Sequence, residues 1–413
     1  MRKITVLAAA IAVLVMGIAL MGMTYYTTQL SLALNGERNI TIGLNGLYEE
    51  AGASAIVGNK DVSDKVKVIG EVDTSIPGTY TLEYKIATLT MERSVTVTDK
   101  MEPELYLEGE DSIEMLLGEE FEEPGFRAVD SSGNDITDKV EVDSSKLVRA
   151  GENYITYTVY DGDKATQLKR KVNVAPNTEY DAPGLAICMY HYVYDENDPP
   201  EDLEGRYSNY ITQTALEEEF NWLKEEGDYF PTWKEVREYV DGELLLPEKS
   251  IVLTFDDGNK NFLKYGTPLA EKCQVPITAF VITSYDGKEK IDEYSNEYIN
   301  WQSHSHNMHR GGGNIGHGGI FTAISYEEGM ADLNESIKIC GSGEAFAYPF
   351  GDYNDHSRKM VEDAGFFCAM TTVDGKAYPG DDPLLLPRVR MFNGQTLDNF
   401  KNKVAPPESQ EEE

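Results

Sequence analysis

The sequence predicts an α/β domain with a parallel sheet, preceded by two small all-β domains and an N-terminal transmembrane helix. Three observations within the 413 residues support this prediction. Apolar strand-like runs alternate with helical stretches after residue 184, the region before them repeats with a period near 75 residues, and the first 25 residues contain a long uncharged stretch. Alternating strands and helices are typical of βα units, and short repeated strands are typical of β-sandwiches.

The N-terminal segment, residues 1–25, has the length and polarity of a membrane anchor. Arg2 and Lys3 precede 20 uncharged residues at 4–23, and about 20 apolar residues span a bilayer as a helix. A cleaved signal peptide usually has a shorter apolar core and a small-residue cleavage site. Neither is evident here, and secretion after cleavage is the alternative. Because basic flanks stay cytoplasmic, we expect a single-pass cell-membrane protein whose following domains are extracellular.

Residues 26–99 and 100–176 are two copies of one pattern. D-K-V-K-V at 64–68 corresponds to D-K-V-E-V at 138–142, and each copy ends in an alternating strand, at 93–97 and 170–174. Short alternating runs separated by Gly, Asn and Asp predict small antiparallel sandwiches. They resemble the bacterial Ig-like modules of cell-surface proteins. We expect them to act as spacers, with glycan binding as the alternative.

A linker at 177–184 leads into the predicted α/β domain, residues 185–404, and an acidic tail follows at 405–413. The strand-like runs are 185–190, 250–255, 277–282, 344–348 and 367–371. The helical stretches are 214–226, 233–240, 326–339 and 357–364. Strands that alternate with helices form βα units, so we expect their sheet to be parallel. The tail is expected to be disordered because it is short and highly charged.

Asp256 and Asp257 stand side by side at the end of the apolar run 251–255. Like charges held this close repel each other, which raises one pKa unless a cation lies nearby. Successive strand residues point to opposite faces, so one carboxylate can bind a metal while the other moves a proton. An ordinary Asp-Gly turn is the alternative interpretation.

Half of the six histidines fall within six residues, at His304, His306 and His309. Two imidazoles with one carboxylate, and a position left for water, form the ligand set of a catalytic zinc site. His304 and His309 are five residues apart, which would separate them around a helix, so we expect ligands on a strand end and its loop. The spacing leaves His306 open as a ligand, and a surface histidine patch is the alternative. The glycine-rich run at 310–319 is expected to be a mobile loop.

Three motifs in this order resemble the polysaccharide deacetylases, also called carbohydrate esterase family 4 or NodB-homology domains. They are T-F-D-D-G at 254–258, H-S with a second histidine five positions on at 304–309, and A-Y-P-F-G at 347–351. The histidine spacing and C-M-Y-H at 188–191 resemble the subgroup that acts on poly-N-acetylglucosamine. The resemblance covers roughly residues 185–400 and implies a distorted (β/α) barrel.

The resemblance implies that Asp257, His304 and His309 bind a divalent ion. We expect Zn²⁺, although Co²⁺ and Ni²⁺ accept the same donors. Such an ion activates water and polarises a carbonyl group. Asp256 is then the expected general base. A backbone N–H near Phe350, in the third motif, is expected to stabilise the oxyanion.

Two positions depart from the family pattern. Ala347 stands where the third motif usually has an arginine that orients the base, a loss that the poly-N-acetylglucosamine subgroup shares. No histidine follows His356, so the late Leu-x-His motif that supplies the general acid has no counterpart. His191 ends the first predicted strand, where barrel active sites gather, and we expect it to replace that acid. A hydrogen-bonded core histidine is the alternative.

The chain is strongly acidic, with a formal charge of −36 from 36 basic and 72 acidic residues. Nucleic acid is therefore not an expected partner, because its phosphates would be repelled. We expect a metal-dependent deacetylase that acts on N-acetylated amino sugars of an extracellular polysaccharide or peptidoglycan. The missing late histidine keeps a second hypothesis open, a catalytically silent surface module that binds metal and glycan. A structural adhesin is disfavoured because it does not need an aspartate pair together with a histidine cluster.

Overall fold

The computed structural model describes residues 12–16, 18, 30–98, 102–131 and 133–405, which form two compact units. Most of the predicted anchor at 1–25 and nearly all of the predicted tail lie outside the described residues. None of the described helices is long and apolar enough to cross a membrane. The residue boundaries of the domains stay predictions.

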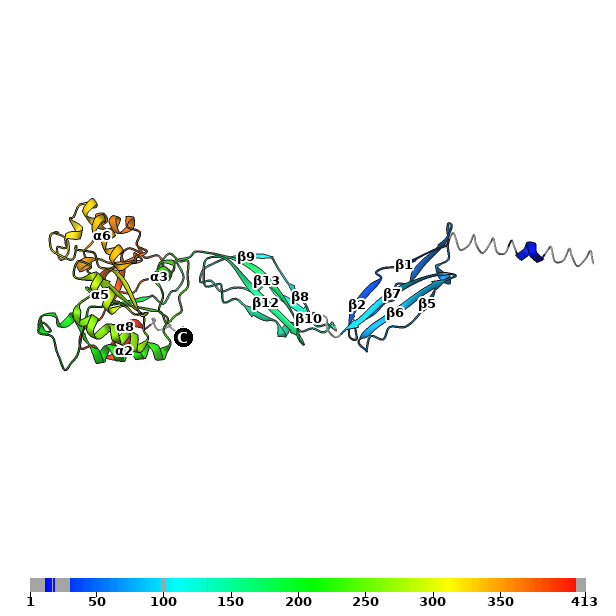
Figure 1. Cartoon of the computed structure of the whole chain (residues 1–413), viewed down its shortest axis with the longest axis horizontal. Coiled ribbons are helices and arrows are strands. Elements are labelled where there is room, and N and C mark those ends of the chain that lie inside the picture. The colour runs from blue at the N-terminus through cyan, green and yellow to red at the C-terminus, as the bar shows by residue number, and fades with distance from the viewer. Residues whose placement is uncertain (1–11, 17, 19–29, 99–101, 132, 406–413) are drawn as a thin grey trace, which may run out of the picture. The chain divides into compact units, whose positions relative to one another are not determined.

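Each sequence repeat forms two small sheets (Figure 1), but the predicted antiparallel pairing is incomplete, because the larger sheet of each repeat contains one parallel pair of strands. The sheet orders are β1-β3-β4 and β2-β7-β6-β5 in the first repeat, and β10-β8 and β11-β12-β13-β9 in the second. The first repeat contains β1 (Leu30–Leu34), β2 (Asn39–Gly43), β3 (Ala53–Val57), β4 (Lys60–Asp61), β5 (Lys67–Ile69), β6 (Gly78–Ile86) and β7 (Leu89–Thr98). The second contains β8 (Glu104–Leu107), β9 (Ser112–Leu116), β10 (Phe126–Val129), β11 (Glu141–Asp143), β12 (Gly151–Asp161) and β13 (Lys164–Ala175).

Both repeats bury an arginine at the corresponding place of their last strand. Arg93 and Arg170 are 0% and 1% exposed. Each donates to main-chain carbonyl oxygens and pairs with a glutamate, Glu50 in the first repeat and Glu123 in the second. A buried charge is tolerated when it is paired and hydrogen-bonded. The arginine that looks like a surface residue in the sequence is therefore an interior residue of each sandwich.

The α/β region is a closed barrel of parallel strands in the order β14-β17-β18-β19-β20-β21-β22, with β22 pairing back to β14. This confirms the predicted α/β class and barrel. The barrel strands are β14 (Ala186–Tyr190), β17 (Ile251–Phe255), β18 (Ile277–Val281), β19 (Ile299–Ser303), β20 (Ala345–Ala347), β21 (Cys368–Asp374) and β22 (Leu386–Arg390). A separate pair of short strands is β15 (Tyr192–Tyr194) and β16 (Tyr210–Thr212).

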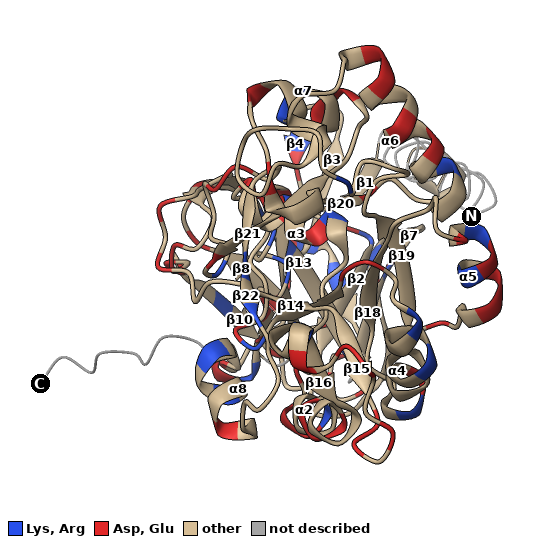
Figure 2. Cartoon of the chain, turned by 90° about the vertical axis from the view of Figure 1, so that its left-hand side faces the viewer, with Lys and Arg blue, Asp and Glu red and all other residues tan. Residues whose placement is uncertain are grey.

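The helices of the α/β region carry much of the acidic charge. They are α2 (Gln213–Glu226), α3 (Trp233–Val240), α4 (Thr267–Cys273), α5 (Gly287–Tyr294), α6 (Tyr326–Cys340), α7 (Asp355–Asp363) and α8 (Leu397–Val404). Figure 2 shows acidic residues distributed over α2, α5, α6 and α7. The predicted helical stretches correspond to α2, α3, α6 and α7.

Two barrel strands, β19 and β22, are not predicted by the sequence pattern because polar residues interrupt them. Gln302 of β19 is buried, and its side-chain oxygen accepts the Ala345 N–H at 2.9 Å. β22 contains Pro387 and two arginines, Arg388 and Arg390. The polar side chains of these strands form hydrogen bonds with residues from other parts of the domain. Such partners allow polar residues inside a barrel strand, and these two strands therefore lack the apolar pattern of the others.

Candidate active site

The predicted site residues gather at the carboxyl ends of the barrel strands, where barrel active sites lie. Asp256 and Asp257 follow β17, His304 follows β19 and His191 follows β14. Phe350 lies in the short 3₁₀ turn Pro349–Gly351 after β20. Tyr190 and Phe255, which precede two of these positions, stack with ring centroids 4.8 Å apart and so hold the two strand ends together.

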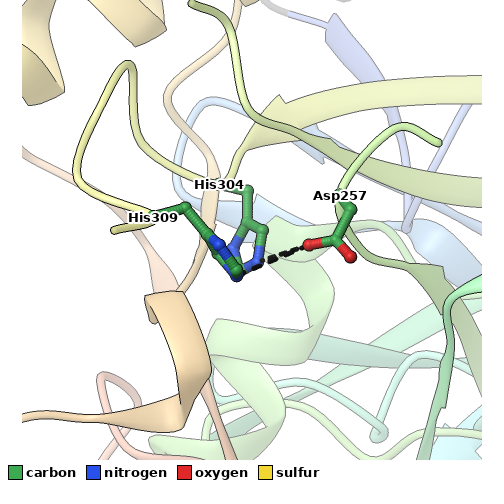
Figure 3. A group of neighbouring side chains, drawn as sticks. All are labelled: Asp257, His304 and His309. Atoms are coloured by element: carbon green, nitrogen blue, oxygen red, sulfur yellow. Dashed lines mark ion pairs between the residues drawn. The ribbon is translucent and has the colours of Figure 1, made fainter. Parts of the chain in front are cut away.

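Asp257, His304 and His309 converge, as Figure 3 shows. Their ligand atoms lie within 4.8 Å of one another. Asp257 Oδ1 is 3.5 Å from Nε2 of each histidine, which is too long for a good hydrogen bond. Metal–ligand bonds of about 2.0–2.1 Å in a tetrahedron place neighbouring donor atoms about 3.4 Å apart. The donor types, and the two spacings between Asp257 and the histidines, therefore fit a shared divalent ion.

In Asp257 and His304, the polar atom that does not face the proposed ion forms a hydrogen bond with a neighbouring group. Tyr192 Oη donates to Asp257 Oδ2 at 2.7 Å, and Arg206 Nη1 donates to Tyr192 Oη at 2.8 Å. His304 Nδ1 lies 2.8 Å from the carbonyl oxygen of Ala347, to which it can donate. Such partners leave Asp257 Oδ1 and His304 Nε2 free to face the same point.

The loop between the two candidate histidine ligands is fastened by α6. Asp332 accepts the N–H groups of His306 and Asn307 at 2.6 and 2.7 Å. The ring Nδ1 of His306 lies 3.0 Å from Thr283 Oγ1, away from the three converging ligand atoms. His306, which the spacing leaves open, is thus absent from this group, and His309 belongs to it.

Asp256 is paired with an arginine from a different strand. Arg388 Nη1 and Nη2 donate to the two oxygens of Asp256, each at 2.8 Å, and Arg388 Nε donates to the Thr371 carbonyl at 2.9 Å. Burial opposes ionisation of Asp256, but Arg388 overcomes it and holds the pKa of Asp256 below its usual value. Arg388 thus contacts the carboxylate that the resemblance would have an arginine at position 347 orient.

Metal binding requires carboxylate and neutral imidazole, and two of the three candidate ligands, Asp257 and His309, have pKa shifts that favour these forms. Burial would raise the pKa of Asp257, but His304, His191 and His309 hold it well below its usual value. Burial and His304 lower the pKa of His309 to about 4. His304 shifts the other way, because the two aspartates outweigh its burial and raise its pKa. His309 is therefore neutral and Asp257 ionised at neutral pH.

Strained backbone concentrates at this site. Three described non-glycine residues here have positive φ: Asp257 at 73°, Ser305 at 69° and Phe350 at 62°. Such conformations cost about 1–3 kcal/mol each and persist where the surrounding structure enforces them. The Phe350 ring also packs on His309, with centroids 4.1 Å apart.

An open pocket of about 350 Å³ surrounds these groups. Its lining residues are His191, Tyr192, Arg206, Asn209, Asp256, Asp257, His304, His309, His317, Tyr348, Phe350, Gly351, Thr372 and Arg390. Burial lowers the pKa of His191, against the opposing effect of the two aspartates. His317 comes from the glycine-rich run, which Asp352 fastens by accepting the N–H groups of His317 and Gly319 at 2.9 Å each. Whether that run is mobile stays a prediction.

Several residues that line the pocket or hold its side chains and loops in place were not predicted from the sequence. Arg388 and Arg390 lie two residues apart on β22, and this R-x-R alternation was the one available signal for them. Tyr192 directly follows His191 but has no motif of its own. Asp332 lies on a helix far from the histidines in sequence, and nothing local indicates its contact with their loop.

Comparisons with known proteins agree with the site. Residues 245–369 match the family model described as polysaccharide deacetylase. Residues 32–97 and 105–174 each match the model described as bacterial surface protein, Ig-like domain.

Two curated relatives each match about half of this chain. A poly-beta-1,6-N-acetyl-D-glucosamine N-deacetylase from Staphylococcus aureus is 24% identical over 249 residues, which is 55% of this chain and 82% of the relative. The enzyme of the same name from Staphylococcus epidermidis is 25% identical over 232 residues, 50% of this chain and 79% of the relative. Among solved structures, a Streptococcus pyogenes deacetylase in complex with acetate shares 22% identity, covers 54% of this chain and 99% of that chain, and has a TM-score of 0.47.

Proposed function

The chain contains a polysaccharide deacetylase domain behind two bacterial surface Ig-like domains, and we propose that it hydrolyses the N-acetyl groups of amino sugars in an extracellular polysaccharide or peptidoglycan in a metal-dependent reaction. The observation that carries this proposal is the convergence of Asp257, His304 and His309 beside the Asp256–Arg388 pair. The names of the curated relatives support an amino-sugar polymer as the substrate.

In this proposal Asp257, His304 and His309 hold the ion, with Zn²⁺ preferred over Co²⁺ or Ni²⁺ for the same donors. When bound, the ion would activate water and polarise the acetyl carbonyl. Asp256 accepts the proton of the attacking water, because Arg388 keeps it ionised and oriented. The Phe350 N–H donates to the developing oxyanion, since the 3₁₀ turn places that residue in the pocket.

His191 is the proposed general acid. It lines the same pocket, and Asp256 and Asp257 are close enough to influence its pKa. Hydrolysis of an amide requires protonation of the leaving amine, and no histidine follows His356 in the chain. Because its pKa is lowered, His191 starts as the neutral imidazole, so in this proposal it receives the proton that Asp256 takes from water and passes it to the leaving amine.

Turnover tests the proposal directly. Acetate release from β-1,6- and β-1,4-linked N-acetylglucosamine oligomers and from peptidoglycan is measured with the purified chain, with and without chelator. We expect release that chelator abolishes and added Zn²⁺ restores. Absence of release from every substrate, with Zn²⁺ still bound, would support a silent glycan-binding module instead.

We further propose that the uncharged segment at 4–23 holds the enzyme in the cell membrane with its other domains outside the cell, the Ig-like domains serving as spacers. The basic pair Arg2 and Lys3 supports this orientation. Cell fractionation with protease treatment of intact cells tests it. Release of the protein into the medium would favour secretion.

A further inference from the structure

We propose that Arg390, with Arg206 lining the same pocket, forms an anion-binding subsite, so that the amino sugar deacetylated here carries a neighbouring carboxylate or phosphate. This inference rests on the proposed function, because it describes the substrate of the same pocket. Its test, however, is a binding measurement that does not depend on turnover.

Arg390 is placed at the mouth of the barrel by the register of β22. It is the last residue of that strand and lies opposite Met189 of β14, two positions before His191. Side chains two residues apart in a strand share a face. On this face Arg388 contacts Asp256, and Arg390, two residues nearer the end of the strand, lines the pocket.

The guanidinium of Arg390 is held in place without being neutralised. Its Nη2 donates to Asn209 Oδ1 at 2.8 Å. Among the described residues, no carboxylate forms an ion pair with its guanidinium, although the Arg390 main-chain N–H donates to Asp374 Oδ1 at 3.4 Å. Asn209 is an uncharged partner that orients the guanidinium group, so the positive charge of Arg390 remains available to a ligand.

Arg206 adds a second, partly neutralised cation to the same pocket. Its Nη1 donates to Tyr192 Oη at 2.8 Å, and its Nε lies 3.5 Å from Asp202. Both members of that ion pair are about half exposed, at 54% and 52%. A solvent-exposed pair of this kind is weak, so Asp202 only partly offsets the charge of Arg206.

The acidic groups of the pocket already have partners. Asp256 is paired with Arg388, and Asp257 faces His304 and His309. Neither is therefore free to neutralise Arg390. A planar guanidinium matches carboxylate and phosphate oxygens in a two-pronged geometry, which neutral sugar hydroxyls do not offer.

The location of these cations is notable because the chain carries a net charge of −36, with acidic residues over the outer helices (Figure 2). Exposed charges are screened beyond about 8 Å at physiological ionic strength. The acidic exterior therefore does not cancel a guanidinium that contacts its ligand directly. The acidic exterior repels polymers that are anionic along their whole length, but it does not prevent binding of a single anion beside the acetamido group.

Isothermal titration calorimetry on the Zn²⁺-loaded full chain tests the subsite with matched ligands. N-acetylmuramic acid carries a lactyl carboxylate, and in its methyl ester a neutral ester group replaces that charge. N-acetylglucosamine 6-phosphate and N-acetylglucosamine form the corresponding phosphate pair. We expect the anionic member of one pair to bind at least about tenfold more tightly than its neutral partner. The pair that shows this preference identifies the source of the anion.

Arg390→Gln should remove the preference while leaving the neutral ligands within about threefold of their original affinity. Arg390→Lys should retain part of it, because it keeps the charge but loses the planar fork. Arg127→Gln, which removes one positive charge from β10 in the second Ig-like repeat, is the matched control and should change nothing.

Equal binding of charged and neutral partners would overturn the inference. So would a preference that survives in Arg390→Gln, because the ion alone would then explain it. If the preference depends on Arg390 but no polymer releases acetate, the subsite stands and the proposed hydrolase activity is what fails.

Discussion

Arg388 and Asp256 form a two-pronged ion pair in the barrel, Nη1 to Oδ1 and Nη2 to Oδ2, each at 2.8 Å, and their side chains are 0% and 3% exposed. Arg388 lies on β22 and Asp256 directly follows β17, and these two strands flank β14. The proposed base is therefore oriented by a cation from across the first barrel strand. This explains how the site keeps an ionised base although Ala347 replaces the arginine of the third motif.

Arg388→Gln should damage both activity and stability. Without the guanidinium, burial raises the pKa of Asp256, so the acid limb of the pH–rate profile should move to higher pH. Leaving a buried charge unpaired costs about 3–5 kcal/mol, which urea unfolding can measure. The double variant Arg388→Gln/Asp256→Asn should recover part of that stability but no activity. An unchanged acid limb would show that Arg388 does not set the ionisation of the base.

The roles of the two neighbouring aspartates should separate cleanly. Asp256→Asn should keep bound Zn²⁺ and lose about 10²–10⁴-fold in kcat, the usual contribution of a general base. Asp257→Asn should lose the metal as well. Metal content by mass spectrometry, measured beside acetate release, distinguishes the two. Loss of Zn²⁺ from both variants alike would contradict the assignment of Asp256 as a base outside the ligand set.

Phe350 should act through its backbone. Its φ of 62° is strained for any side chain, and glycine adopts that conformation freely. Phe350→Gly keeps the N–H donor and should retain kcat within about tenfold, since losing one oxyanion donor costs about 10²–10³-fold. The structural cost is the lost packing on His309. A fall in kcat of several hundredfold, with Zn²⁺ still bound, would show that the aromatic ring itself is needed.

A buried carboxyl on α2 should make the barrel less stable as the pH rises. Glu219 is 1% exposed and accepts hydrogen bonds from Tyr190 Oη and Gln395 Nε2, each at 2.7 Å. Burial raises its pKa from 4.5 to about 7. The folded state thus prefers the neutral acid. That contribution is complete below the unfolded pKa and is lost as the pH rises through about 7, amounting to about 3 kcal/mol.

Glu219→Gln mimics the neutral acid, because its amide can donate to Tyr190 while its oxygen accepts from Gln395. The free energy of unfolding of this variant should depend less on pH between about 5 and 8, and it should exceed that of the parent at pH 8. Urea unfolding at several pH values measures this. Glu225→Gln, on the exposed face of the same helix, is the control and should follow the parent. If both variants follow the parent, Glu219 does not titrate in this range.

Many of the strands and helices could be predicted from the pattern of residues that are close in sequence. The strand-like run at 251–255 is β17, and the helical stretch at 233–240 coincides with α3. Each depends on residues that are neighbours in sequence, such as an unbroken apolar run or the capping box at Thr232. The grouping of Asp257, His304 and His309 was also predicted, but through the resemblance of the D-D-G and H-S motifs to the polysaccharide deacetylases, since β19, the strand before His304, was not predicted.

The long-range contacts that complete the site depend on the tertiary structure of the barrel and could not be predicted from the sequence. Arg388 reaches Asp256 across 132 positions of sequence, and Ala347 holds His304 across 43. A buried arginine has no local signature, since its cost is met by partners that the closed barrel brings within reach. The residue types of the chain were thus enough to indicate the chemistry, whereas the packing of β22 against β14 determined which side chains orient the base and which cation faces the pocket.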